Sequence, residues 1–472
     1  MRQNAGHEVL SGPGTLRNGE TRALSRSAVD RLRAIIAGDC ETTRTQRDAL
    51  TAFSVRIASA GLLYLSQIVL ARWMGGFEYG IYVFVWTWVL VLGGLSHLGL
   101  NLAMIRLLPE YRETGRHELL RGLLRGGRFA ALGLGTLIAA LALAALVPLA
   151  THLENHYVLP LYLALVCVPL FTLTDVQDGV GRGLAWMSVA LLPPYVLRPL
   201  LLLVAMAGAN IAGLPMTATT AAAAAIVATW TTAIVQTLLV NRRIARELPQ
   251  AQRAYDFKGW FTFSGPLLVI VASELVLQNA DVLVISRFLG PTEVGFYFAA
   301  AKTMSLIMFV HYAVGSAVAN RFATLDARGD KEGLKAFVRD AVHWTFWPSL
   351  LCAAAILALG KPLLWLFGPQ FTEGYPVMFI LVIGFLFRSA MGPAEFLLNM
   401  LGEQVLGATV LAITALLSIA LNFALVPHFG MIGAASATAI SLVAAALMNY
   451  VLVRRRLDIE IGIWNNLGKR QP

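Results

Sequence analysis

Long apolar segments constrain the fold of this chain more than any other feature of its sequence. A membrane-spanning helix needs roughly 20 mainly apolar residues, and windows of that kind recur from residue 52 to residue 453. Of the 472 residues, 57% are hydrophobic and 14% are charged, whereas about 25% of the residues of soluble domains are charged. The sequence therefore predicts an all-α polytopic membrane protein. Its twelve predicted transmembrane helices are 52–71, 80–102, 129–150, 157–175, 185–208, 217–240, 261–286, 294–319, 340–360, 375–399, 404–426 and 431–453.

The distribution of positive charge predicts the orientation of these spans. With the N-terminus inside, 30 of the 37 Lys and Arg residues lie in inside segments. The outside loops hold only Arg72, Arg287 and Lys361. Cytoplasmic loops are enriched in Lys and Arg, so both termini are predicted to be cytoplasmic. The net charge of +10 is thereby explained by topology, and no nucleic-acid partner is expected.

A repeated motif divides the spans into two halves. The stretch LARWMGGFEYGIY (70–82) is followed 215 residues later by ISRFLGPTEVGFY (285–297). Both lie between apolar segments, and their glycines allow a tight reversal of the chain. Six spans in each half predict parallel repeats, that is, two six-helix lobes around a central cavity. The predicted parts are a disordered basic tail (1–50), an N-lobe (51–241), a cytoplasmic linker (242–260), a C-lobe (261–456) and a second tail (457–472).

Two inside connectors have amphipathic patterns. Residues 116–129, RHELLRGLLRGGRF, place leucines on one helical face and arginines elsewhere, and residues 331–342, KEGLKAFVRDAV, do something similar. Both patterns predict basic helices that lie in the membrane interface. Such helices either anchor the topology or contact anionic lipids.

Several segments resemble one family of exporters. The two corner motifs, the stretch SGPLLVIVASELVLQNADVLVISRFLGPTEVGFYFAAAK (264–302) and LVPHFGMIGAASATAIS (425–441) are similar to the polysaccharide/O-antigen flippase branch of the multidrug/oligosaccharidyl-lipid/polysaccharide exporter superfamily. The resemblance covers roughly residues 50–455. It implies a flippase of the bacterial cytoplasmic (inner) membrane that translocates undecaprenyl-diphosphate-linked oligosaccharide by alternating access. Expected partners are this lipid-linked glycan, membrane lipids and the polymerase and glycosyltransferases of O-antigen or exopolysaccharide synthesis.

Ionisable residues inside the predicted spans are the candidate site residues, because such groups are costly in lipid unless they face a cavity or a partner. The cations Arg198, Lys302 and Arg388 are central, and Glu274 is the single central acid. A diphosphate would balance these cations through the planar fork of Arg and the point charge of Lys. Alternatively, these groups form ion pairs with one another, and the most plausible pair is Lys302 with Glu274 or Asp281. The remaining candidates are Arg56 for the diphosphate, although snorkelling explains its position, and Glu274, Asp281 and His311 for coupling to a proton or another ion.

Two other functions remain open. A multidrug or cation antiporter of the same superfamily is expected to carry buried acids, whereas the central charge here is net positive. A membrane glycosyltransferase or polysaccharide polymerase would need catalytic groups on a substantial loop. The longest outside loop, 361–374, has one acid, and the chain contains no GxGxxG motif or P-loop. Its three cysteines are far apart and form no metal-binding pattern. We therefore expect neither enzymatic activity nor a catalytic residue, cofactor or metal.

Overall fold

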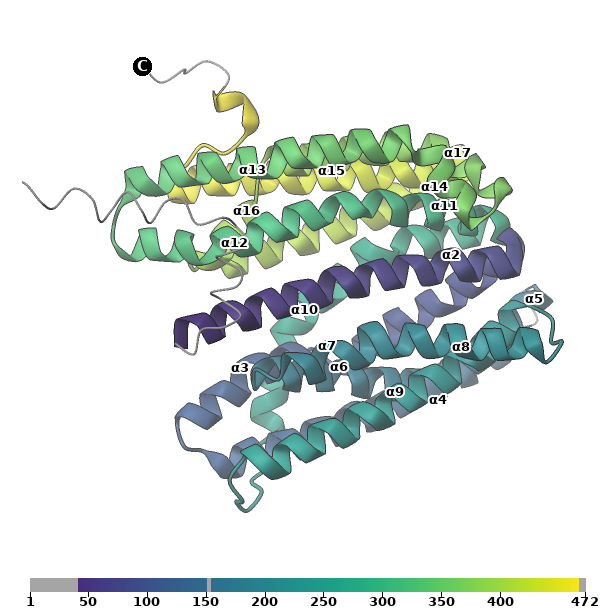
Figure 1. Cartoon of the computed structure of the whole chain (residues 1–472), viewed down its shortest axis with the longest axis horizontal. Helices are drawn as coiled ribbons and strands as arrows, with labels where there is room; N and C mark the ends of the chain where they lie inside the picture. The colour runs from purple at the N-terminus through teal and green to yellow at the C-terminus, as the bar shows by residue number, and fades with distance from the viewer. Residues whose placement is uncertain (1–40, 151–153, 467–472) are drawn as a thin grey trace, which may run out of the picture. The chain divides into compact units, whose positions relative to one another are not determined.

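The computed structural model describes residues 41–150 and 154–466, with side chains from residue 59 onward to 464. Contacts divide the chain into the units Met1–Ala58 and Ser59–Pro472, and the second unit contains all of the described helices except the beginning of the first. Every regular element in the described residues is a helix (Figure 1). The α-helices are α2 (Glu41–Ser96), α3 (Leu100–Glu113), α4 (His117–Leu149), α5 (Asn155–Leu165), α6 (Val168–Gly183), α7 (Met187–Leu192), α8 (Arg198–Ile211), α9 (Ala218–Glu247), α10 (Phe257–Phe288), α11 (Pro291–Met304), α12 (Met308–Ala327), α13 (Lys331–Ala358), α14 (Gly360–Phe367), α15 (Tyr375–Ala390), α16 (Ala394–Met400) and α17 (Gln404–Leu457). The shorter elements are η1 (Pro193–Leu197), η2 (Ser305–Ile307), η3 (Pro369–Gly374) and η4 (Ile463–Asn466).

The lengths of these helices confirm a polytopic membrane protein. In the described part of the chain, nine helical segments are long and apolar enough to cross a membrane. The number is up to ten if the bent pair α5 and α6 forms one span. Two of these segments, in α2 and α17, contain a break in their helical geometry, at Gly75 and Gly430.

Both breaks fold the chain back on itself. Gly75 has φ 74° and ψ 171°, and the hydroxyl of Tyr79 donates to Oε1 of Gln67 over 2.9 Å. Twelve residues of straight helix would separate these two by about 18 Å. In α17, a Cβ on Gly433 would lie only 2.3 Å from the carbonyl oxygen of Leu425. The two reversals coincide with the predicted boundaries between spans one and two and between spans eleven and twelve, while the count of twelve itself stays a prediction.

The helices of the second unit form two groups, as the sequence predicts. Helices α4, α6 and α9 pack together with α3, α5 and α8, and helices α12, α13, α15, α16 and α17 form the other group. Helix α10 contacts both groups, since it packs against α17 and against α3. Figure 1 shows the two groups on opposite sides of α10. We call them the N-lobe and the C-lobe.

The repeated corner motifs contact each other. A Cβ on Gly80 would lie 1.7 Å from the carbonyl oxygen of Pro291, and a Cβ on Gly295 would lie 2.9 Å from that of Gly76. Residues 76 and 291, like residues 80 and 295, are equivalent in the repeat. The contact is therefore reciprocal, as expected for corners that meet at a pseudo-two-fold axis. Glycine is needed at both positions because the backbones touch.

The two amphipathic segments do not form separate interfacial helices, so that expectation is corrected. Residues 117–129 are the first turns of α4, and residues 331–342 are the first turns of α13. Leu120, Leu123 and Leu124 are at most 2% exposed and belong to the core of the N-lobe. Leu334 and Val338 occupy the corresponding place in the C-lobe. Their apolar faces pack on protein rather than on lipid.

Candidate functional site

Arg198 lies at an irregular point of the N-lobe. Pro193 and Pro194 lack backbone N–H groups, and residues 193–197 form a π-helical turn directly before α8 begins at Arg198. The guanidinium carbon lies 5.1 Å from the ring centroid of Phe171 and 5.6 Å from that of Trp86. Within the described residues, this guanidinium makes no ion pair and no hydrogen bond. Its closest stabilising contacts in the described structure are therefore these two aromatic faces, and the Asp175 carboxylate attracts it from farther away.

A small cavity adjoins Arg198. Its volume is about 40 Å³, and Gln67, Trp86 and Thr229 are among the residues that line it. Tyr82 also lines the cavity and stacks on Trp86, with ring centroids 6.3 Å apart and planes inclined by 15°. The cavity thus combines a cation, hydrogen-bonding groups and a pair of stacked rings.

Lys302 lies in α11, which packs against α15 of the C-lobe, and it is next to a contact with α2. Its ammonium nitrogen lies 5.0 Å from the ring centroid of Phe298. The neighbouring Thr303 hydroxyl lies 2.9 Å from the hydroxyl of Tyr64 in α2. Tyr64 follows Leu63, which lines the cavity at Arg198. Arg198 and Lys302 therefore lie near the same turn of α2.

Of the two acids expected to pair with Lys302, Asp281 lies close enough to attract its charge but forms no direct ion pair with it in the described structure. Asp281 accepts a hydrogen bond of 2.7 Å from the hydroxyl of Tyr297. Glu274 is an exposed residue of α10. Among the described side chains, neither acid forms an ion pair with Lys302, and Glu274 forms none at all.

Arg388 is paired with an acid. Its Nη2 lies 2.7 Å from both carboxylate oxygens of Glu395, and the two side chains are 20% and 38% exposed. The predicted span 375–399 is interrupted between them, because Gly392 has φ 67° and α16 starts only at Ala394. The ion pair bridges this interruption. Arg388 is therefore neutralised within its own lobe.

His311 and Arg56 complete the predicted set. His311 is 1% exposed, and within the described structure both of its ring nitrogens lack a hydrogen-bond partner. Its ring centroid lies 6.4 Å from that of Phe396, next to Glu395 in α16. Arg56 belongs to α2, but its side chain lies outside the described residues.

The three predicted cations share one local feature. Arg198 follows the π-helical turn, Lys302 precedes the 3₁₀ turn at Ser305–Ile307, and Arg388 precedes the interruption at residues 391–393. Irregular turns of this kind are where helices bend, and they often occur at functional sites. The cations thus lie where movement of the helices would shift them.

A buried polar group of the N-lobe escaped the sequence-based prediction. Nε2 of His97, a residue without exposed surface, lies 2.7 Å from Oδ2 of Asp175. Nδ2 of Asn101 donates to the same oxygen over 3.4 Å. In α6, Arg182 and Asp178 form a further ion pair of 2.7 Å. The available signal was the presence of His97 and Asp175 at the ends of apolar segments.

Family models match both halves of the chain. The model described as polysaccharide biosynthesis protein matches residues 46–323, and the model described as MatE matches residues 266–424. A protein of Shigella flexneri named putative O-antigen transporter is 25% identical over 214 residues, which cover 44% of this chain and 48% of that relative. The chain thus matches about half the length of this relative.

Solved structures share the fold. An inward-facing multidrug resistance MATE family transporter of the MOP superfamily superposes with a TM-score of 0.67 at 14% identity, covering 92% of this chain and 98% of that one. The lipid II flippase MurJ in an inward closed conformation gives a TM-score of 0.64 at 14% identity, covering 85% and 87%. At this identity the likeness concerns the fold alone, and it confirms the two-lobed architecture.

Proposed function

Because this chain belongs to the polysaccharide biosynthesis protein family, in the polysaccharide-exporter branch of the MOP superfamily, we propose that it is a flippase for a lipid-linked oligosaccharide. The proposed substrate is an undecaprenyl-diphosphate-linked glycan, moved across the bacterial inner membrane with both termini of the flippase in the cytoplasm. The two lobes would expose the site to one side of the membrane at a time. The product would serve the polymerase and glycosyltransferases of O-antigen or exopolysaccharide synthesis.

The observation that supports this proposal is the unpaired guanidinium of Arg198. A cation in the interior of a membrane protein is costly without an opposite charge, and aromatic faces compensate only part of this cost. A diphosphate supplies the missing negative charge and matches the planar fork of an arginine. The stacked rings of Tyr82 and Trp86 beside it would offer an apolar surface to the first sugar.

Lys302 and Arg388 have unequal roles in this proposal. Lys302 forms no ion pair in the described structure, although Asp281 lies close enough to attract its charge, so it would be the second phosphate ligand. Arg388 would bind phosphate only by exchanging Glu395 for it, in a state of the transporter where α15 and α16 have moved apart. Arg56, in the predicted first span, is the remaining proposed ligand of the diphosphate.

The coupling ion is a separate part of the proposal. Buried His311, with two nitrogens that lack a partner in the described residues, is the first candidate to carry a proton, and Glu274 and Asp281 are the acids that would bind a cation. Transport of a fluorescent diphosphate-linked glycan into proteoliposomes should stop when the gradient of the coupling ion is collapsed. Transport that survives the loss of both proton and sodium gradients would exclude this coupling.

The central test replaces Arg198 by Ala in the full-length protein. We expect surface glycan, or transport in proteoliposomes, to fall at least about tenfold at unchanged protein level, since truncating one partner of a buried charge pair costs at least about 2 kcal/mol. The matched control is Arg287→Ala, which removes an outside corner arginine. Unimpaired transport in Arg198→Ala and Lys302→Ala alike would refute the proposed ligands.

A multidrug antiporter is the second candidate, because Glu274 is exposed, forms no ion pair in the described structure, and lies in the half of the chain that the MatE model matches. A cationic substrate would require an acid, so Glu274→Gln should then abolish resistance to cationic drugs. The flippase predicts no effect of the chain on drug resistance and a loss of glycan export in Arg198→Ala. The two phenotypes separate the candidates.

A further inference from the structure

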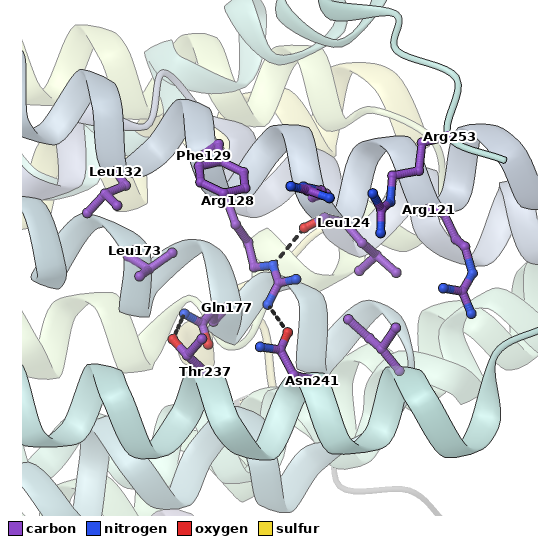
Figure 2. Close-up of a pocket in the computed structure, with 12 residues that line it drawn as sticks. Arg121, Leu124, Arg128, Phe129, Leu132, Leu173, Gln177, Thr237, Asn241 and Arg253 are labelled. Atoms are coloured by element: carbon purple, nitrogen blue, oxygen red, sulfur yellow. Dashed lines mark hydrogen bonds between the residues drawn. The ribbon is translucent and has the colours of Figure 1, made fainter. Parts of the chain in front are cut away.

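A second cationic cavity lies in the N-lobe, apart from Arg198. Its volume is about 420 Å³, and it is formed by α4, α6, α9 and the segment between α9 and α10. Arg121, Arg125 and Arg128 reach it from α4, and Arg253 reaches it from the connecting segment. Figure 2 shows Arg128 between α4 and the helix of Asn241. This end of the lobe is the one predicted to face the cytoplasm.

The four arginines have no acid to balance them in the described structure. No Asp or Glu of the described residues lines the cavity, and none of the four arginines forms an ion pair with any side chain that the structure describes. Like charges around one cavity repel each other. An anion in the cavity would turn this repulsion into attraction.

Two of the arginines are fixed in position by hydrogen bonds. Arg121 donates to the carbonyl oxygens of Pro249 over 2.7 Å and of Leu248 over 3.0 Å. Arg128 donates to the carbonyl oxygen of Leu124 over 2.7 Å and to Oδ1 of Asn241 over 2.8 Å. The amide oxygen of Asn241 is used, and its N–H donors have no partner among the described residues, so they remain for a ligand. The donors are held in place before any anion arrives.

A buried acceptor adds a second requirement. Gln177 has no exposed surface, lines the cavity and donates to Oγ1 of Thr237 over 2.9 Å. Its Oε1 is buried and has no partner in the described residues, and such an acceptor is costly to leave unsatisfied. A ligand that satisfies it must carry a hydroxyl or another hydrogen-bond donor in addition to its negative charge.

An exposed apolar face of α4 continues from the cavity. Phe129, which lines the cavity, is 62% exposed, and Leu137 and Leu141 on the same face are 53% and 60% exposed. Positions four apart share a face of a helix, so Gly133 lies between Phe129 and Leu137. A Cβ on Gly133 would meet no described atom within 4 Å. An acyl chain could lie along this face while its headgroup occupies the cavity.

The described part of the C-lobe lacks this arrangement, which argues against simple anchoring of the topology. Helices α4 and α13 start 214 residues apart, each after a glycine with positive φ, 69° at Gly115 and 67° at Gly329. In this register Arg121 corresponds to Lys335, which pairs with Asp458, and Arg128 corresponds to the buried Val342. A topology signal would serve both repeats, whereas the cationic cavity is specific to the first.

We propose that the cavity of Arg121, Arg125, Arg128 and Arg253 binds the headgroup of an acidic glycerophospholipid. The phosphodiester accepts hydrogen bonds from the arginines, a headgroup hydroxyl donates to Oε1 of Gln177, and an acyl chain follows Phe129, Leu137 and Leu141. Arg253 and the carbonyl groups bonded to Arg121 belong to the segment that joins the lobes. The lipid would therefore contact the segment that joins the lobes. This site is independent of what the central site transports.

Binding can be measured by native mass spectrometry and by thermal shift of the purified full-length protein. Phosphatidylglycerol should bind and raise the melting temperature, whereas phosphatidylcholine should not. Arg125→Gln and Arg253→Gln, at two exposed arginines without a hydrogen-bonded partner among the described residues, should each weaken this binding at least about fivefold. The matched control is Arg339→Gln, the counterpart of Arg125 on α13, which should bind as the wild type does.

Other probes separate the sources of the anion. Phosphatidylmethanol has the same charge and no headgroup hydroxyl, so it should bind more weakly than phosphatidylglycerol. Inorganic phosphate and glycerol phosphate should not protect the protein at millimolar concentrations. Protection by either of them equal to that by the lipid would overturn a lipid site in favour of a soluble anion. Unchanged phosphatidylglycerol binding in both arginine variants would overturn the site altogether.

Discussion

The N-lobe and the C-lobe treat their positive charges differently. In the C-lobe, Arg388 pairs with Glu395 in the predicted membrane interior, and Lys335 pairs with Asp458 over 2.9 Å at the predicted cytoplasmic end. In the N-lobe, neither Arg198 in the predicted membrane interior nor Arg121 at the predicted cytoplasmic end forms an ion pair within the described structure. This difference concerns only the four cations just named, since Arg182 and Asp178 of the N-lobe do form an ion pair.

The two lobes therefore differ in how their cations can interact with an anionic ligand. A cation with its own acid is satisfied by the protein, and an anionic ligand must compete with that acid. A cation without an acid gains from any anion that reaches it. In our proposals the N-lobe receives the anions, at the site of Arg198 and in the cavity on α4. In the C-lobe, Arg388 and Lys335 have acids of their own, whereas Lys302 forms no ion pair within the described structure.

The largest effect is expected from giving the N-lobe arginine an acid of its own. Leu202 is one helical turn after Arg198 and lines the same cavity, so Leu202→Glu places a carboxylate beside the guanidinium. A diphosphate would then have to displace this carboxylate. We expect transport to fall at least about tenfold, which corresponds to about 1.4 kcal/mol, as measured by transport of a labelled lipid-linked glycan into proteoliposomes.

The control for this variant is Leu202→Gln, which has the same shape and no charge. It should retain most of the transport, because Arg198 stays unpaired. Equal losses in the two variants would mean that the size of residue 202, rather than the charge of Arg198, determines transport. In that case the contrast between the lobes would have no bearing on function.

A smaller effect on stability is expected at the paired arginine. Arg388→Ala leaves Glu395 without its partner, and because both side chains keep some exposure we expect a loss of about 1–3 kcal/mol in the free energy of unfolding. Arg198→Ala should lose less, since only the contacts with Phe171 and Trp86 disappear. Unfolding of both variants in a denaturing detergent series would compare the two arginines.

A double-mutant cycle separates the ion pair from other effects of these substitutions. Arg388→Ala and Glu395→Ala should be less than additive, with a coupling free energy of about 1 kcal/mol or more. Arg198→Ala with Glu395→Ala, which combines residues of different lobes, is the additive reference. A coupling near zero for the pair would show that Arg388 is not stabilised by Glu395.

The sequence allowed most of the fold to be predicted, for physical reasons. Apolar segments long enough to cross the bilayer locate the spans, because the hydrocarbon interior disfavours polar side chains and unpaired backbone groups. The corner motifs located the repeat because close backbone contact, as at Gly80 and Gly295, restricts both positions to glycine. The amphipathic segments were misjudged because periodicity identifies an apolar face without saying whether protein or lipid covers it. Leu120 and Leu334 turned out to be covered by protein.

The partners of the charged residues were much harder to predict. Arg388 and Glu395 are seven residues apart, close to two helical turns, but the interruption at Gly392 hides their common face. His97 and Asp175 meet from different helices, so no local pattern joins them. The lack of an acid beside Arg198 in the described structure likewise depends on what α2, α6 and α9 place around it. Positions of candidate residues follow from the sequence, whereas their pairing requires the packing of helices.

The smallest effect is expected at the cytoplasmic ion pair of the C-lobe, Lys335 with Asp458. Asp458 is fully exposed, and the Lys335 ammonium holds the pKa of its carboxyl below the usual range. A lowered pKa means that the pair stabilises the fold above the ordinary pKa of Asp, about 3.9. This contribution is lost as the pH falls through the lowered value.

Asp458 has φ 53°, which asparagine tolerates well, so Asp458→Asn removes the charge without backbone strain. We expect a slightly lower melting temperature than the wild type at pH 7 in low salt, and no difference in 1 M salt, where the Debye length is about 3 Å. Glu403→Gln, at an acid without an ion pair in the described structure, is the control and should leave the melting temperature unchanged. A large decrease that persists in high salt would show that Asp458 supports the C-lobe in some way other than by its charge.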